Sequence, residues 1–136
     1  MDVLNQPSRL RILLVEDHAD TAEVFARGIK AKGHDVQVAR DYSTALRLGQ
    51  DCDFDLLMCD IALPDGNGSD LLPTLRSICA NPSLRGIILS AKGMATDVQQ
   101  ARAAGYEAHL IKPVTFEEIF AAIDQRLPDK PLVSRQ

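Results

Sequence analysis

Residues 10–17 have the sequence Leu-Arg-Ile-Leu-Leu-Val-Glu-Asp, in which a nearly continuous aliphatic run ends in two adjacent carboxylates. Short aliphatic runs of this kind are typical of strands that are buried on both faces. Similar runs follow at 54–59, 86–89 and 108–111, and each is followed closely by a polar residue: Asp60, Ser90 and Lys112. The pattern predicts a buried sheet with polar side chains at the ends of its strands.

Helical periodicity separates these runs. Apolar residues recur at helical spacing near 22–29, 45–48, 71–78, 98–104 and 116–127, and a brief alternating strand is predicted at 36–38. Strand and helix thus alternate five times, and the short connections leave room only for right-handed crossovers. We therefore predict an α/β fold, a doubly wound parallel sheet with helices on both faces.

The predicted domain covers residues 9–127, with short polar tails at 1–8 and 128–136. Its last helix begins at Thr115 and Glu118, which have capping-box spacing, and Pro128 ends it. Its apolar face consists of Phe116, Ile119, Phe120, Ile123 and Leu127. The turn formers of 63–68 predict a loop. Five strand–helix units fill the chain, so we expect no effector domain within these 136 residues.

Composition narrows the classes of function. A chain of 136 residues with 46% hydrophobic residues fits one folded domain, and its net charge of −4 argues against sequence-blind binding of nucleic acid. Neither a secretory signal nor an apolar run of the roughly 20 residues that span a bilayer is present, so we expect a cytoplasmic protein without membrane contact. The three cysteines, Cys52, Cys59 and Cys79, are predicted to be reduced thiols rather than a disulfide framework or a zinc site.

The polar residues at the strand ends are the candidate site, because parallel strands bring their carboxyl ends to one edge of the sheet. These residues are Glu16, Asp17, Asp60, Ser90 and Lys112. Each alone has an ordinary explanation as a helix cap, a turn residue or a surface lysine. Together, clustered carboxylates would bind a hard cation such as Mg²⁺, and a carboxylate beside that cation can attack phosphorus to form an acyl phosphate. A lysine and a hydroxyl would neutralise the phosphoryl oxygens, and Asp60 is the natural nucleophile.

These motifs, with the Leu-Pro-Asp-Gly turn at 63–66 behind Asp60, make the chain resemble the receiver domain of response regulators in two-component and phosphorelay systems. The resemblance covers nearly the whole chain, residues 9–127, and implies the flavodoxin-like strand order 2-1-3-4-5. The segment around His109, Ala-His-Leu-Ile-Lys-Pro at 108–113, is also similar to the receivers of hybrid sensor histidine kinases.

The resemblance implies a role for each site residue. Asp60 would be the phosphoacceptor, charged from a phosphohistidine on a sensor histidine kinase or a histidine phosphotransfer protein. Mg²⁺ would be held by Asp17, by Glu16 through water, by Asp60 and by the backbone carbonyl of Ala62. Lys112 would pair with the phosphoryl group, in a loop fixed by a cis peptide bond before Pro113. Ser90 and His109 would form the conformational switch.

Some residues depart from the family pattern. His109 stands where the family usually has Tyr or Phe; it is either a strand histidine without a role or the switch residue, with sensitivity to pH. Ser90 replaces the commoner Thr but keeps the hydroxyl.

Alternative functions follow from the same residues. A degenerate receiver would act only as a protein-docking module. An aspartate-nucleophile phosphatase would need a second Asp two residues after Asp60, where this chain has Ala62. A phosphate-binding loop for a nucleotide or flavin does not follow the first strand. We therefore expect a signalling module that catalyses only its own phosphorylation and dephosphorylation, with a downstream target that the sequence does not name.

Overall fold

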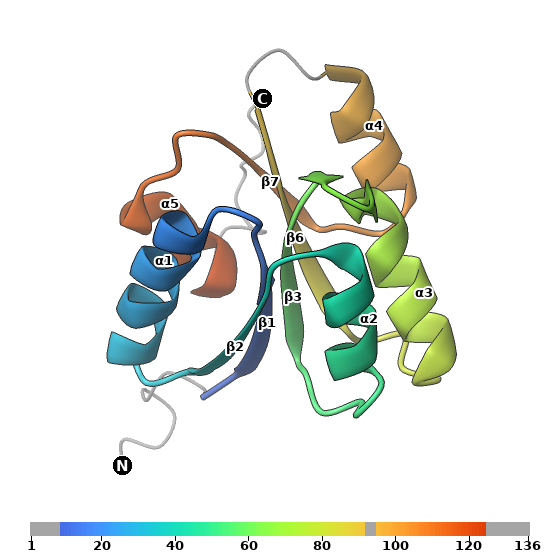
Figure 1. The fold of residues 1–136 in the computed structure, drawn as a ribbon, viewed down its shortest axis with the longest axis horizontal. Helices are drawn as coiled ribbons and strands as arrows, with labels where there is room; N and C mark the ends of the chain where they lie inside the picture. Colours follow the sequence, from blue (N-terminus) through green and yellow to red (C-terminus); the bar gives the residue numbers. More distant parts are fainter. Residues whose placement is uncertain (1–8, 92–94, 125–136) are drawn as a thin grey trace.

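The computed structural model describes residues 9–91 and 95–124, with a parallel sheet at the centre (Figure 1). The sheet has five strands in the order β2-β1-β3-β6-β7. Their bounds are β1 Arg11–Val15, β2 Asp35–Ala39, β3 Leu56–Asp60, β6 Arg85–Ser90 and β7 Ala108–Ile111. All four neighbouring pairs are parallel. Counting only these strands gives the order 2-1-3-4-5, so the predicted doubly wound flavodoxin-like fold is confirmed.

Helices cover both faces of the sheet. Helices α1 (Ala19–Ala31) and α5 (Phe116–Asp124) lie on one face, and α2 (Tyr42–Gly49), α3 (Leu71–Ile78) and α4 (Ala95–Ala103) lie on the other (Figure 1). Each face has its own apolar core, and β1, β3 and β6 contribute to both. These strands are almost wholly buried, as their aliphatic sequences predict. None of the helices in the described ranges is long and apolar enough to cross a membrane.

Two helix starts have the capping contacts that their sequences favour. The Asp41 carboxylate accepts a hydrogen bond of 2.7 Å from the Thr44 amide at the start of α2. At the start of α5, the Glu118 carboxylate accepts from the Thr115 amide, and the Thr115 hydroxyl accepts from the Glu118 amide. This is the predicted capping box. Leu127, Pro128 and both predicted tails lie outside the described residues.

The segment predicted as a loop is more ordered than expected. Strands β4 (Ala62–Leu63) and β5 (Gly66–Asn67) form a small antiparallel hairpin, and a 3-10 helix follows at Gly68–Asp70. The Gly68 amide donates to the Ile61 carbonyl at 2.7 Å. A Cβ atom at Gly68 would overlap the carbonyl oxygen of Asp60, so only glycine allows this close approach. The hairpin is thereby packed directly against the end of β3.

The expectation of three reduced thiols is wrong for two of them. Cys52 and Cys79 form a disulfide with a Cα–Cα distance of 5.4 Å, whereas Cys59 is a free, buried thiol. The two bonded residues are 27 apart in sequence. They meet because α2 and α3 run side by side and end next to each other, with Cys52 shortly after α2 and Cys79 at the end of α3. No local sequence pattern predicts that Cys52 and Cys79 lie close together.

Candidate functional site

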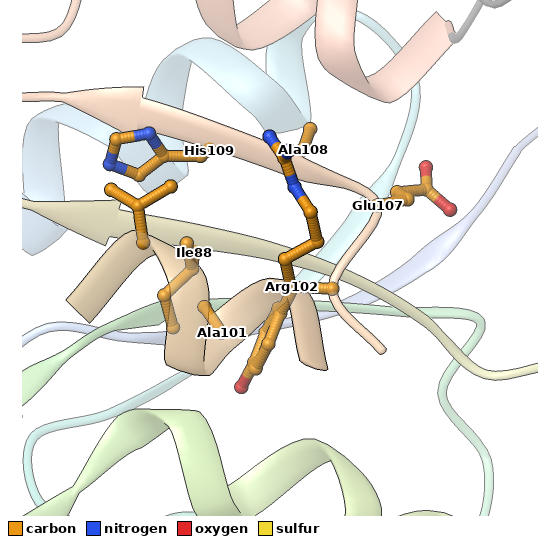
Figure 2. A pocket seen from close by; sticks show the side chains of 8 residues that line it. Ile88, Ala101, Arg102, Glu107, Ala108 and His109 are labelled. Atoms are coloured by element: carbon orange, nitrogen blue, oxygen red, sulfur yellow. The ribbon is translucent and has the colours of Figure 1, made fainter. Parts of the chain in front are cut away.

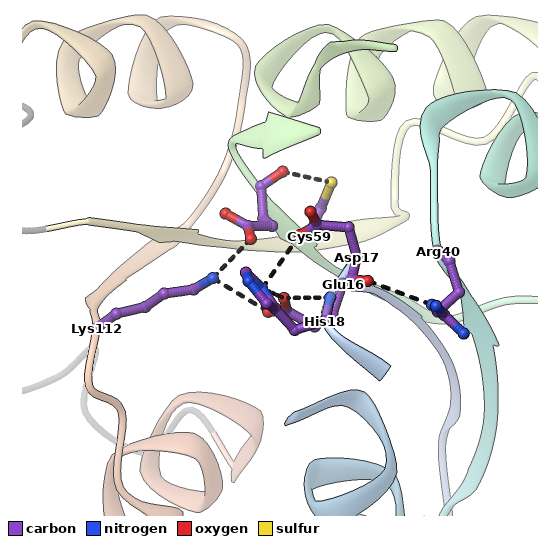
Figure 3. A network of polar contacts seen from close by, with 7 residues as sticks. Glu16, Asp17, His18, Arg40, Cys59 and Lys112 are labelled. Carbon is purple, nitrogen blue, oxygen red and sulfur yellow. Dashed lines mark hydrogen bonds and ion pairs between the residues drawn. The ribbon is translucent and has the colours of Figure 1, made fainter. Parts of the chain in front are cut away.

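The fold brings three of the predicted residues into one buried cluster at the carboxyl edge of the sheet (Figure 3). Glu16 follows β1, Asp60 ends β3 and Lys112 follows β7. The Lys112 Nζ lies 2.6 Å from the Asp60 Oδ2 and 3.2 Å from the Glu16 Oε1. Glu16 is fully buried and Asp60 is 5% exposed. The Lys112 ammonium group therefore forms ion pairs with two buried carboxylates.

This arrangement shifts the pKa of Asp60. Burial raises the pKa of its carboxyl group, the hydrogen bond and charge of Lys112 act against that rise, and the nearby Glu16 carboxylate adds to it. The result is a raised pKa. Burial alone would lower the pKa of Lys112, but its hydrogen bond to Asp60 and the charges of Asp60 and Glu16 outweigh burial and raise it. Lys112 is therefore a cation held next to carboxylates whose negative charge it offsets only in part.

The two carboxylate oxygens of Glu16 differ in their hydrogen bonds. Its Oε2 accepts a 3.1 Å hydrogen bond from the His18 amide, and the His18 Nδ1 lies at the same distance. Its Oε1 is buried and has no hydrogen-bond partner among the described residues, although the Lys112 ammonium lies nearby. A buried carboxylate oxygen without a hydrogen bond is costly unless a water or a cation satisfies it.

Asp17 and His18 lie beside Glu16 at the start of α1. Ligand atoms of the three side chains lie within 4.8 Å of one another, so together they could hold a metal ion. Asp17 is partly exposed, and its carbonyl oxygen accepts from the Arg40 Nε at 3.3 Å. His18 is not among the ligands predicted from sequence; its side chain is 72% exposed, which is ordinary for a histidine at a helix start. The oxygen-rich donor set suits a hard divalent cation.

Ser90 and His109 form a second contact at the same edge. Ser90 is buried at the end of β6, and its Oγ lies 2.6 Å from the Nε2 of His109 on β7. Among the described residues, this is the hydrogen bond of the Ser90 side chain. Sequence reasoning paired the two residues as a switch, but it did not predict direct contact between them. His109 is half-buried, and the hydrogen bond distinguishes it from an unengaged strand histidine.

The remaining predicted site residues lie on the surrounding loops. Ala62 is exposed at the start of β4, and the role of its carbonyl as a metal ligand stays a prediction. The Lys112–Pro113 peptide bond is cis, as the resemblance implies. The Lys112 amide donates to the Ser90 carbonyl at 2.8 Å, so the lysine and the serine are held side by side.

Comparison with known proteins bears on this arrangement. The family model of the response regulator receiver domain matches residues 12–124. The chain is 32% identical over 114 residues to the transcriptional regulatory protein CusR of Escherichia coli K12, covering 84% of this chain and 49% of CusR. It is also 32% identical over 119 residues to the DNA-binding response regulator MtrA of Mycobacterium leprae, covering 88% of this chain and 52% of MtrA. The chain thus spans about half the length of these curated relatives.

Solved structures agree with the sequence comparison. A CheY-like response regulator receiver domain protein from Methanospirillum hungatei superposes with a TM-score of 0.80 at 25% identity, over 89% of this chain and 95% of that one. The non-phosphorylated HemR receiver domain from Leptospira biflexa gives 0.77 at 28% identity, over 86% and 93%.

The fold and the acidic edge therefore define an α/β protein of the CheY-like receiver class. The chain belongs to the response regulator receiver domain family, with the match extending over most of its length.

Proposed function

We propose that this receiver domain accepts a phosphoryl group on Asp60 and changes conformation as a result. The observation that carries the proposal is the contact of the buried Asp60 carboxylate with the Lys112 ammonium at 2.6 Å, beside Glu16. An acceptor carboxylate needs a nearby cation, because the incoming phosphoryl group adds negative charge to a site that already contains two carboxylates. Lys112 supplies that cation from a position fixed by the end of β7.

The transfer is a displacement at phosphorus. One Asp60 carboxylate oxygen forms the new bond, and the bond between phosphorus and the imidazole nitrogen of the donor breaks, with the electron pair leaving on the donor imidazole. Lys112 then pairs with a phosphoryl oxygen. Ser90 lies at the neighbouring strand end, where its hydroxyl can donate to another phosphoryl oxygen when its proton is not donated to His109.

We further propose that Mg²⁺ is the cofactor. Asp17, Asp60 and the Ala62 carbonyl would hold the ion, and Glu16 would hold it through water. The buried Oε1 of Glu16 lies near the Lys112 ammonium but accepts no hydrogen bond among the described residues, and a water bound to a cation could donate that missing bond. When bound, Mg²⁺ supplies positive charge to the phosphoryl oxygens.

The proposed partners are those of a phosphorelay: a sensor histidine kinase or a histidine phosphotransfer protein as donor, and a protein target for output. On this proposal the domain acts in the cytoplasm and is not an enzyme toward other substrates. It catalyses only its own phosphorylation and dephosphorylation.

Incubation with acetyl phosphate and Mg²⁺, followed by intact-protein mass spectrometry, tests the proposal. The wild-type protein should gain one phosphoryl group that is lost at alkaline pH, as expected of an acyl phosphate. Asp60→Asn should abolish the gain. Omitting Mg²⁺ with a chelator should suppress it.

Asp70→Asn is the matched control. Asp70 is an exposed aspartate before α3 whose side chain makes no capping hydrogen bond, so its loss of charge should leave the phosphorylation unchanged. An unmodified wild-type protein, or a modification that survives in Asp60→Asn, would contradict the proposed acceptor. Unmodified wild-type protein would instead favour the docking module.

A further inference from the structure

The 2.6 Å hydrogen bond between Ser90 and His109 has consequences for the Ser90 proton. Ser90 is 1% exposed, so bulk water does not readily replace His109 as its partner. A hydroxyl has one proton to donate, and a neutral imidazole has one bare nitrogen and one N–H. The direction of this hydrogen bond is therefore set by whether Nε2 carries a proton.

The two directions differ in what Ser90 can offer to a phosphoryl group. If Nε2 is bare, the Ser90 hydroxyl donates to it, and its only proton is used. If Nε2 carries a proton, it donates to the Ser90 oxygen, and the hydroxyl proton is free to reach a phosphoryl oxygen. The second arrangement is a chain, N–H···O–H···O–P, in which each hydrogen bond polarises the next.

We propose that His109 is a positioning residue that sets the direction of the Ser90 proton, so that proton uptake by the imidazole favours the phosphorylated form of Asp60. The proposal rests on the proposed phosphoacceptor function and adds a coupling to pH. By reciprocity, the negative phosphoryl group would also favour the protonated imidazole.

The surroundings of His109 support a neutral ring before phosphorylation. His109 lines a small pocket of about 30 Å³ between α4 and the strands β6 and β7, together with residues that include Ile88, Ala101 and Arg102 (Figure 2). Burial lowers the pKa of the His109 imidazole, and the charge of Arg102 on α4 lowers it further. A neutral ring can leave Nε2 bare, and Ser90 is then the donor in the hydrogen bond between the two side chains.

The other charged or titratable groups near His109, among the described residues, are already paired. The Glu107 carboxylate lies 2.7 Å from an Arg85 nitrogen. The Tyr106 hydroxyl donates to the Gly68 carbonyl at 2.8 Å. Lys112, three residues along the chain, pairs with Asp60. A new negative group on Asp60 is thus the change at this edge that would act on His109.

The first experiment tests the hydrogen bond between Ser90 and His109 in the unphosphorylated protein. Histidine side-chain ¹⁵N NMR across a pH series follows the His109 titration in the wild type, in Ser90→Ala and in a control, Ser83→Ala, on an exposed turn. Ser90→Ala removes the hydrogen bond to the neutral ring and the stronger, charge-assisted one from the protonated ring, so the His109 midpoint should move to lower pH. The control should match the wild type. Identical midpoints in the wild type and Ser90→Ala would overturn the proposal.

The second experiment tests the coupling between protonation of His109 and phosphorylation of Asp60. The fraction phosphorylated by acetyl phosphate and Mg²⁺ is measured between about pH 5.5 and 8 for the wild type, His109→Phe and His109→Gln. At each pH, the phosphorylated fraction is divided by that of His109→Phe, which removes the pH dependence that all three proteins share. For the wild type this ratio should rise about fivefold toward acid pH, which corresponds to the free energy of one net hydrogen bond. The His109→Gln ratio, with a permanent amide donor, should stay flat.

The outcomes separate the two proposals. Phosphorylation of all three proteins with one shared pH profile would refute the coupling while leaving Asp60 as the acceptor. Absence of phosphorylation in all three would refute the acceptor function and the coupling with it, while the NMR result would still report whether Ser90 and His109 share a hydrogen bond.

Discussion

The Cys52–Cys79 disulfide provides a quantitative test of the structure. It ties the end of α2 to the end of α3, on helices that are already in close contact. Reduction should therefore leave the fold intact but release a loop in the unfolded chain. The folded domain should become less stable, because the unfolded ensemble regains the entropy that the bond removes.

The size of the effect follows from the length of that loop. The bond joins residues 27 apart in sequence. The chain-entropy relation then gives a loss of about 12 cal/mol/K in the unfolded state, or about 3.5 kcal/mol near room temperature. At an unfolding entropy of roughly 2.1 cal/mol/K per residue, a domain of this size should melt roughly 12 °C lower when reduced.

Thermal unfolding followed by circular dichroism, with and without a phosphine reductant, measures this difference. The double variant Cys52→Ser/Cys79→Ser is the matched control, and its melting temperature should equal that of the reduced wild type and not respond to reductant. Thiol titration gives a second check, because buried Cys59 should react only after unfolding. A wild-type melting temperature that reductant leaves unchanged would refute the disulfide.

Two further predictions concern the core of the site and the opposite end of the sheet. Gly68→Ala should destabilise the domain by about 1–3 kcal/mol in urea unfolding and suppress phosphorylation, because the new Cβ displaces the Asp60 backbone. Gly66→Ala, whose new Cβ would have the Tyr42 side chain as its nearest neighbour, should retain phosphorylation. Buried His34 accepts a 3.0 Å hydrogen bond from the Leu10 amide through Nδ1, and burial lowers its pKa. The unfolded chain therefore binds this proton more readily, so the contribution of His34 is complete above its ordinary pKa of 6.5 and is lost as pH falls below it. His34→Asn keeps a hydrogen-bond acceptor that does not titrate, so the variant should lose less stability than the wild type as the pH falls. If the urea midpoints of variant and wild type fall equally from pH 7.5 to about 5, His34 is not the cause of the decline.

Much of the fold could be predicted from local patterns. The aliphatic runs of β1, β3 and β6 marked strands buried on both faces, and their strand order followed from a family resemblance rather than from the patterns themselves. The hairpin at β4 and β5 was missed, because turn-forming residues predict a change of chain direction but not the two short pairings on either side of it.

For the site, the residues were predictable from the sequence, but the contacts between them were not. The chain determined by itself which polar residues end the strands, because hydrophobic periodicity places the strand ends and parallel strands share one edge. Only the tertiary structure decided which side chains touch: Lys112 with Asp60, Ser90 with His109, and Cys52 with Cys79. It also decided that one oxygen of Glu16 is buried without a hydrogen bond from any of the described residues. Such contacts depend on side-chain direction and on the packing of elements far apart in the chain, which local periodicity does not encode.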